Sequence, residues 1–189
     1  DVAGNNGSGD SLSLSTDTTA PTATITLADS ALIKGETSLV TITFSEAVTG
    51  FANADVTVAN GTLTALTSAD GGITWTGTFT PTDSIEDTSN VVTLANTYTD
   101  VAGNTGTTAS SANYTIDTVA PTLDITAADS NLSAGETTTL TFTFSEAVSG
   151  FAAGDVTVAG GTLGALSSAD GGVTWTASLT QPGADAPSV

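Results

Sequence analysis

The feature that most constrains the fold is an internal repeat of 100 residues. The segment TITFSEAVTGFANADVTVANGTL at 41–63 returns as TFTFSEAVSGFAAGDVTVAGGTL at 141–163. Between residues 17 and 80, about two thirds of the positions carry the same residue as the position 100 further on. Such self-similarity indicates a series of equivalent structural units rather than one large domain.

The repeat divides the chain into three parts. The opening DVAGN recurs at 100–104, so residues 1–16 are predicted to be the C-terminal strand of a preceding repeat. Residues 17–116 form a complete repeat, and residues 117–189 form an incomplete one. The incomplete copy is expected to lack its last two strands, because nothing after Thr180 matches NVVTLANTYTDVAGN. With no initiator Met or signal peptide in it, the sequence is expected to be an internal piece of a longer array.

Each unit is expected to be built from β-strands. Val40, Ile42 and Phe44 alternate with threonines, and the same period of two surrounds Trp75. About seven short strands in 100 residues, with one buried Trp, predict an all-β fold of tandem immunoglobulin-like β-sandwiches. The chain contains no Cys, so Trp75 is expected to pack on aliphatic side chains alone.

Strand lengths and turns follow from the same pattern. One strand is expected over 38–48 and another over 91–99. Hairpin turns are predicted at 60–61 and 70–72, where Asn or Asp precedes Gly. Phe51, which follows a Gly in a loop, is expected to pack against the core.

The composition excludes several classes of function. The chain has 20 acidic residues and one basic residue, Lys34, for a net charge of −19, which would repel nucleic acid and anionic membranes. His and Cys are absent, so the usual zinc, copper and haem ligands and most catalytic constellations are missing. The remaining ligands are oxygen atoms, which suit calcium. No apolar run reaches the length of a membrane span.

The acidic residues are expected to lie at the two ends of the sandwich, because the strands alternate in direction. A calcium ion at either end would offset the repulsion between them. For any single acid, a turn or capping role is an equal alternative. The candidate ligands at the upper end of repeat one are Asp17, Glu46, Asp70, Asp100 and Asn104. The candidates at the junction with the next repeat are Asp29, Glu86, Asp87, Asp117, Glu146 and Asp170.

Several motifs carry a resemblance to a known family. The segments DTTAPT, FSEAVTGF, DGGITWTGTFTP and YTDVAGN resemble the bacterial Ig-like tandem repeats of giant RTX-type and biofilm surface adhesins. The resemblance implies a non-catalytic extender at the bacterial surface, exported by type I secretion. It also implies junctions between neighbouring repeats that calcium makes rigid.

Two alternative functions remain open. The loops at the tip of the sandwich can form a calcium-dependent carbohydrate-binding module. The chain can also be a fibre subunit, because residues 10–16 align with 110–116, the last strand of repeat one. That segment could pair with the incomplete repeat of another copy by strand addition.

Overall fold

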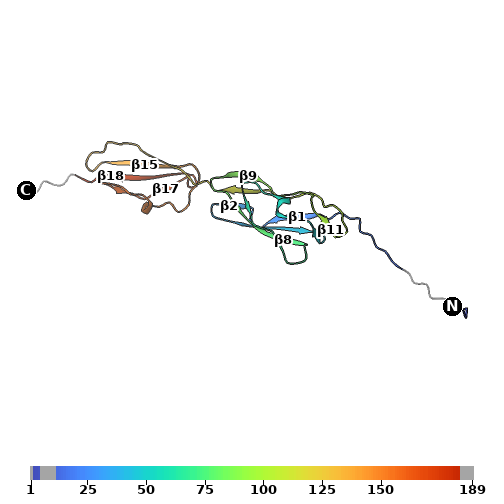
Figure 1. Cartoon of the computed structure of the whole chain (residues 1–189). Helices are drawn as coiled ribbons and strands as arrows, with labels where there is room; N and C mark the ends of the chain where they lie inside the picture. Colours follow the sequence, from blue (N-terminus) through green and yellow to red (C-terminus); the bar gives the residue numbers. More distant parts are fainter. Residues whose placement is uncertain (1, 5–11, 184–189) are drawn as a thin grey trace, which may run out of the picture. The chain divides into compact units, whose positions relative to one another are not determined.

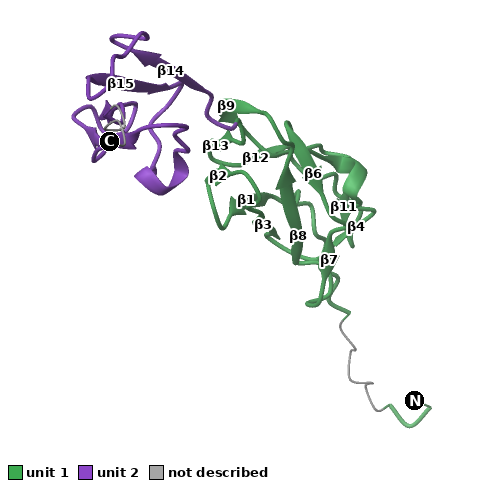
Figure 2. Ribbon diagram, turned by 90° about the vertical axis from the view of Figure 1, so that its left-hand side faces the viewer, with its two compact units in different colours: residues 1–119 green, residues 120–189 purple. Residues whose placement is uncertain are grey.

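The computed structural model describes residues 2–4 and 12–183, and the chain divides into two compact units (Figures 1 and 2). The first unit spans 1–119 and the second spans 120–189. The predicted all-β class is confirmed: the described residues form strands and two short 3₁₀ turns, with no α-helix. The segment proposed as a strand of a preceding repeat lies partly outside the described residues. Its described part, 12–16, is exposed and takes no strand conformation.

One sheet of the first unit has the order β1-β3-β8-β6, with β7 also paired to β8. In β3 the side chains of Val40, Ile42 and Phe44 are buried, while those between them are more exposed, as the alternation predicts. Ile42 lies opposite Ile25 on one side and Trp75 on the other. The strands are β1 (Ala23–Leu27), β3 (Ser38–Phe44), β6 (Gly61–Leu63), β7 (Thr67–Ser68) and β8 (Thr74–Pro81).

Shorter strands form the opposite layer of the first unit. Three groups of paired strands make up this layer: β2-β13-β9, β12-β10-β5 and β11-β4. Within it, β13 runs parallel to β2 and antiparallel to β9. The strands are β2 (Ala31–Ile33), β4 (Val48–Thr49), β5 (Val56–Thr57), β9 (Glu86–Asn90), β10 (Thr93–Leu94), β11 (Thr99–Asp100), β12 (Ala109–Ser110) and β13 (Tyr114–Asp117). A 3₁₀ turn, Asn53–Asp55, precedes β5.

The core of the first unit lies between the two layers. The long sheet contributes buried aliphatic and aromatic side chains, and the opposite layer contributes two buried tyrosines with their aliphatic neighbours. From the first layer these are Ile25, Val40, Ile42, Phe44 and Phe79, and from the second Leu32, Val92, Leu94, Tyr98, Tyr114 and Ile116. This arrangement is the immunoglobulin-like sandwich expected from the sequence.

Two predicted strands are shorter than expected. The strand predicted over 38–48 ends at Phe44, and the chain then leaves the sheet to form β4 opposite β11. The Ser45 hydroxyl accepts a hydrogen bond from the backbone N–H of Thr22, which holds the chain at this corner. The strand predicted over 91–99 is likewise split into β10 and β11. Ala95 lies in the loop between these two strands, and its backbone N–H donates a hydrogen bond to the carbonyl of Asp55.

The environment of Trp75 differs from the prediction. The Trp75 ring packs edge-on against the Phe51 ring, with 5.0 Å between centroids, rather than on aliphatic side chains alone. Phe51 also contacts Phe44 and is buried, as expected for a loop residue that packs against the core. Antibody domains pack their buried Trp against a disulfide. In this chain without Cys, an aromatic ring contacts Trp75.

Asn60-Gly61 is not the predicted hairpin turn. The strands on either side, β5 and β6, pair with β10 and β8 respectively, so this turn joins the two layers. Asn60 has a φ of 56°, which Asn tolerates better than most residues. Its side-chain amide donates hydrogen bonds to Asp87 at 2.8 Å and to the buried Asn90 at 2.9 Å.

In the second unit, the strands of residues 120–183 form one sheet, with the order β14-β15-β18-β16 and with β17 paired to β18. Its registers repeat those of the first unit: Ile125 lies opposite Phe142, as Ile25 lies opposite Ile42. Every residue of β14 is exposed. The strands are β14 (Leu123–Ala127), β15 (Thr137–Phe144), β16 (Thr162–Leu163), β17 (Ser167–Ser168) and β18 (Thr174–Thr180), with a 3₁₀ turn at Ala153–Asp155.

Candidate metal centre

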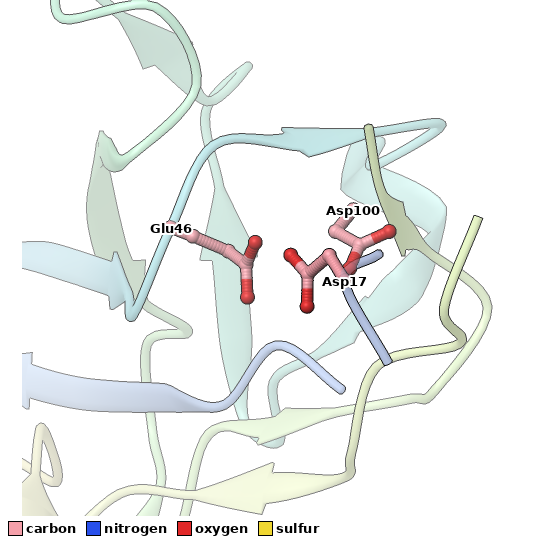
Figure 3. A group of neighbouring side chains, drawn as sticks. All are labelled: Asp17, Glu46 and Asp100. Atoms are coloured by element: carbon pink, nitrogen blue, oxygen red, sulfur yellow. The ribbon is translucent and has the colours of Figure 1, made fainter. Parts of the chain in front are cut away.

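Three carboxylates meet at the end of the first unit where the chain enters it. Asp17 lies before β1, Glu46 lies two residues after β3, and Asp100 ends β11. One carboxylate oxygen from each of the three side chains lies within 4.8 Å of one from each of the other two. Figure 3 shows the carboxylates of Asp17 and Glu46 facing each other, with Asp100 beside Asp17. Among the described residues this is the one such group of three or more acidic side chains.

Strand pairing explains why these residues meet. Asp100 lies opposite Val48 in the β11-β4 pair, so it comes close to Glu46, two residues before Val48. The Asn104 amide donates a hydrogen bond to the backbone carbonyl of Asp17, at 3.2 Å, and holds the incoming segment beside β11. Alternating strand directions predict that four candidate residues lie at one end of the sandwich: Asp17, Glu46, Asp100 and Asn104. In the structure they lie close together at that end.

Asp100 is held as a carboxylate by the turn that follows it. Its side chain is 2% exposed and accepts hydrogen bonds from the backbone N–H and the side-chain amide of Asn104, at 2.8 and 2.7 Å. Burial raises the pKa of Asp100, but these bonds and two from the backbone of the turn outweigh it. Its pKa therefore lies below the ordinary value.

Glu46 is in the opposite situation. Desolvation raises its pKa, and the negative charges of Asp17 and Asp100 raise it further. Folding therefore shifts the equilibrium of Glu46 toward its protonated form relative to the unfolded chain, unless a positive charge is placed among the three carboxylates. A cation there removes the repulsion and releases any proton that Glu46 holds.

The spacing of the oxygens fits a calcium ion. Calcium–oxygen distances of about 2.4 Å allow two ligands of one ion to lie up to about 4.8 Å apart. Magnesium requires shorter bonds and a near-ideal octahedron, and it retains several waters. The side-chain carbonyl of Asn104 and the backbone carbonyl of Asp17 are further oxygen donors near the three carboxylates.

Asp70 lies outside this cluster. Its carboxylate accepts hydrogen bonds from the Ser68 hydroxyl at 2.9 Å and from the backbone N–H of Thr74 at 2.8 Å, so it is occupied by its own turn. The backbone bond from Thr74 is the main cause that lowers its pKa to about 2. The Ser68-x-Asp70 spacing was the signal in the sequence for this local role. Asp170 makes the same bonds in the second unit, and its pKa is also about 2.

The junction candidates of the first unit lie at its opposite end. Three of them hold local structure: Asp29 accepts the N–H of Ala31, Asp87 accepts the N–H of Ser89 and the amide of Asn60, and Asp117 accepts the N–H of Val119. Asp117 also lies opposite Glu86 in the β13-β9 pair.

The remaining junction candidates, Glu146 and Asp170, belong to the second unit. By position in the repeat, Asp117 and Glu146 correspond to Asp17 and Glu46. A calcium site between repeats therefore stays a prediction.

The fold and its repeated registers define a chain of immunoglobulin-like sandwich domains. Both repeats match the family model of the bacterial Ig-like domain, over residues 17–116 and 117–188. The chain belongs to the bacterial Ig-like domain family. No curated protein matches it. Domains of this family are typical of surface proteins and are usually non-catalytic. Within the described part of the chain, no helix has the length and hydropathy to span a bilayer.

Proposed function

We propose that this chain is a spacer in a bacterial cell-surface adhesin, and that calcium stiffens the joints between its repeats. The repeated unit supports this proposal, because identical sandwiches in series build length without adding chemistry. The neighbouring repeats are the partners that each unit requires. The motifs shared with RTX-type and biofilm adhesins support an extracellular location and export by type I secretion.

One observation carries the proposal: Asp17, in the segment that enters the repeat, lies within 4.8 Å of Glu46 and Asp100 of the sandwich. An ion bound by all three ties the incoming segment to the body of the domain. Pro21, a few residues later, fixes its own φ and further limits the motion of this segment. A joint restrained in both ways bends less than a free linker.

Charge gives calcium a strong effect on this chain. Without cations, a net charge of −19 favours expansion, and the three carboxylates repel one another. Calcium sites of extracellular modules bind at about 10⁻⁴–10⁻³ M, so the proposed site is filled outside a cell and empty in calcium-poor cytoplasm. The chain would therefore remain flexible before export and become stiff afterwards.

Calorimetry combined with small-angle scattering tests the proposal. The 189-residue chain is scanned in calcium and in EDTA at constant ionic strength, and scattering is recorded on the same samples. We expect calcium to raise the melting temperature and to lengthen the particle. Magnesium at equal concentration serves as the control for general screening of charge. Identical melting and identical maximum dimension in calcium and EDTA would contradict the spacer with calcium-stiffened joints.

A further inference from the structure

Thr118, the residue that follows β13, is polar and yet buried, with 2% of its surface exposed. Its hydroxyl donates a hydrogen bond to the carbonyl of Thr82, at 2.8 Å, and accepts one from the backbone N–H of Ile85, at 2.9 Å. Its backbone N–H donates to the carbonyl of Ile85 at 2.7 Å, and its carbonyl accepts the N–H of Ser84 at 3.3 Å. These bonds attach the chain to the turn between β8 and β9 at the point where it leaves the first repeat.

The strand before Thr118 is held on both edges. In β13 the side chains of Tyr114 and Ile116 are each 1% exposed and belong to the core. On one edge the Thr115 N–H donates a hydrogen bond to the Ser30 carbonyl, at 2.9 Å, and the strand then runs parallel to β2. On the other edge Ile116 lies opposite Asp87 of β9. The strand that leads out of the repeat is therefore a central strand of its layer.

The direction of β13 decides how tension acts on these bonds. In the first unit, β4 and β11 lie toward the end where the chain enters, and β2, β9 and β13 lie toward the other end (Figure 2). β2 follows β1 in the chain and runs parallel to β13. Tension along the chain therefore pulls β2 toward the entrance and β13 toward the exit, so the two strands slide past each other. Because the hydrogen bonds run across the strands, this shear stretches them together rather than one after another.

The exit side has the shorter ladder of hydrogen bonds. At the entrance, β1 pairs with β3 over five residues, and the Thr22 N–H is also bonded to the Ser45 hydroxyl. At the exit, β13 pairs with β2 over three residues, and its pairing with β9 shifts register between Tyr114 and Ile116. The bonds of Thr118 come directly after this short ladder. They are therefore the first bonds that tension at the exit loads.

We propose that Thr118 is the residue through which the first repeat resists tension along the chain. Its hydrogen bonds to residues 82–85 lengthen the short ladder at the exit and must break before β13 can slide out of the core. This load-bearing role goes beyond that of a spacer. It rests on the proposed function in one respect, because a spacer in series transmits tension, and it requires no calcium.

Single-molecule stretching of the 189-residue chain measures this resistance. The chain has no cysteine, so pairs of introduced thiols can attach handles at chosen exposed positions. Handles at Thr18→Cys and Val119→Cys, the shear pair, apply tension along β13. Handles at Ser30→Cys and Ala112→Cys, the peeling pair, pull on adjacent ends of β2 and β13 and open their bonds in succession. In EDTA, we expect the shear pair to require the larger unfolding force, and equal forces would overturn the proposal.

Substitution at Thr118 identifies the residue. Thr118→Val removes the hydroxyl at nearly constant size and should raise the unfolding rate at constant force by about tenfold with the shear pair. With the peeling pair the rate should not change, because those handles load the opposite end of β13. Thr118→Ser keeps a hydroxyl and should retain the resistance. The matched control is Ser111→Ala, which removes another buried hydroxyl that accepts a backbone N–H, that of Val92 at 3.0 Å, and should leave the shear rate unchanged.

The comparison of handles separates load bearing from a general contribution to stability. A rate that Thr118→Val raises equally with both pairs, or an equal effect of Ser111→Ala on the shear rate, would overturn the role of Thr118. The result is also independent of the proposed calcium effect, because the forces are measured in EDTA. A shear rate unchanged by Thr118→Val, in a chain whose melting temperature still rises with calcium, would overturn this inference alone.

Discussion

The two repeats differ in burial although they share registers. Each unit forms its own five-stranded sheet, and the two sheets have the same strand order. Ile25 and Ile125 are paired to equivalent residues of the neighbouring strand. Among the described residues, a second layer of strands covers this sheet in the first unit and not in the second. The comparison teaches that strand pairing is encoded locally in each repeat, whereas burial of the face around Ile25 depends on the second layer, most of whose strands lie between residues 86 and 117.

The largest expected effect comes from the same substitution in both units. Ile25→Ala removes buried methyl groups and should cost about 2–5 kcal/mol of the free energy of unfolding. Ile125→Ala acts at an exposed side chain and should change it by less than about 0.5 kcal/mol. Each unit has one Trp, so denaturation can be followed separately in variants that retain only Trp75 or only Trp175. Equal costs in dilute solution would show that the second unit buries this face.

Calcium should also act differently on the two units. The first repeat brings together Asp17, Glu46 and Asp100. The second repeat has counterparts of the first two, Asp117 and Glu146, and the 189-residue sequence contains no counterpart of Asp100. Calcium at 100 times its dissociation constant should stabilise the first unit by about 2.7 kcal/mol. The melting of the second unit, followed through Trp175, should change less, because two carboxylates offer fewer ligands than three.

Substitution at Asp100 sharpens this test. Asp100→Asn removes a buried ligand charge and should abolish the stabilisation by calcium. Asp83→Asn makes the same change of charge at an exposed residue outside the cluster and should preserve it. Calcium binding should also strengthen as the pH rises through the raised pKa of Glu46, because the charged form binds the ion. A calcium response retained in Asp100→Asn would place the ion elsewhere.

A smaller effect is expected at the turn that joins the layers. Asn60→Gly keeps the positive φ available but removes the hydrogen bonds to Asp87 and Asn90, so it should cost the first unit about 1–3 kcal/mol. The second repeat already has Gly160 at this position, with a φ of 78°. The reverse change, Gly160→Asn, should therefore add no stability there, because the second unit has no counterpart of Asp87. Chemical denaturation measures both, and a gain from Gly160→Asn would contradict the assigned role.

How much of this could be predicted from the sequence depends on the range of each interaction. The alternation of Val40, Ile42 and Phe44 identified β3, because the period of two is a local property. Alternating strand directions were enough to bring Asp17, Glu46 and Asp100 to one end. The role of Asn60 was missed, because a turn between layers and a hairpin turn carry the same local signal. The end of β3 at Phe44 was missed because Val48 resumes the period of two, although Glu46 interrupts the apolar pattern between them.

Asp70 shows a second limit. Topology placed it at the same end as the three clustered carboxylates, but a carboxylate can bond within its own turn or reach toward its neighbours. The choice depends on loop geometry within a few tenths of an ångström. Here the backbone N–H of Thr74, four residues after Asp70, donates a hydrogen bond to the Asp70 carboxylate, so Asp70 bonds within its own turn. A residue-level prediction of the ligands therefore requires side-chain positions, whereas a prediction of the end at which they gather does not.

The smallest predicted effect should be equal in the two units, because it depends on the turn alone. The pKa values of Asp70 and Asp170 are lowered to about 2, so each carboxylate stabilises its unit above its ordinary pKa of 3.8. This contribution should be lost as the pH falls from about 4 toward about 2. Asp70→Asn and Asp170→Asn mimic the protonated form, so each variant should be less stable than the parent chain at pH 5 and equal to it near pH 2. Unfolding of the single-Trp variants across this range measures the difference. A pH dependence of the stability in one unit only would show that the contribution of this turn depends on the second layer of strands.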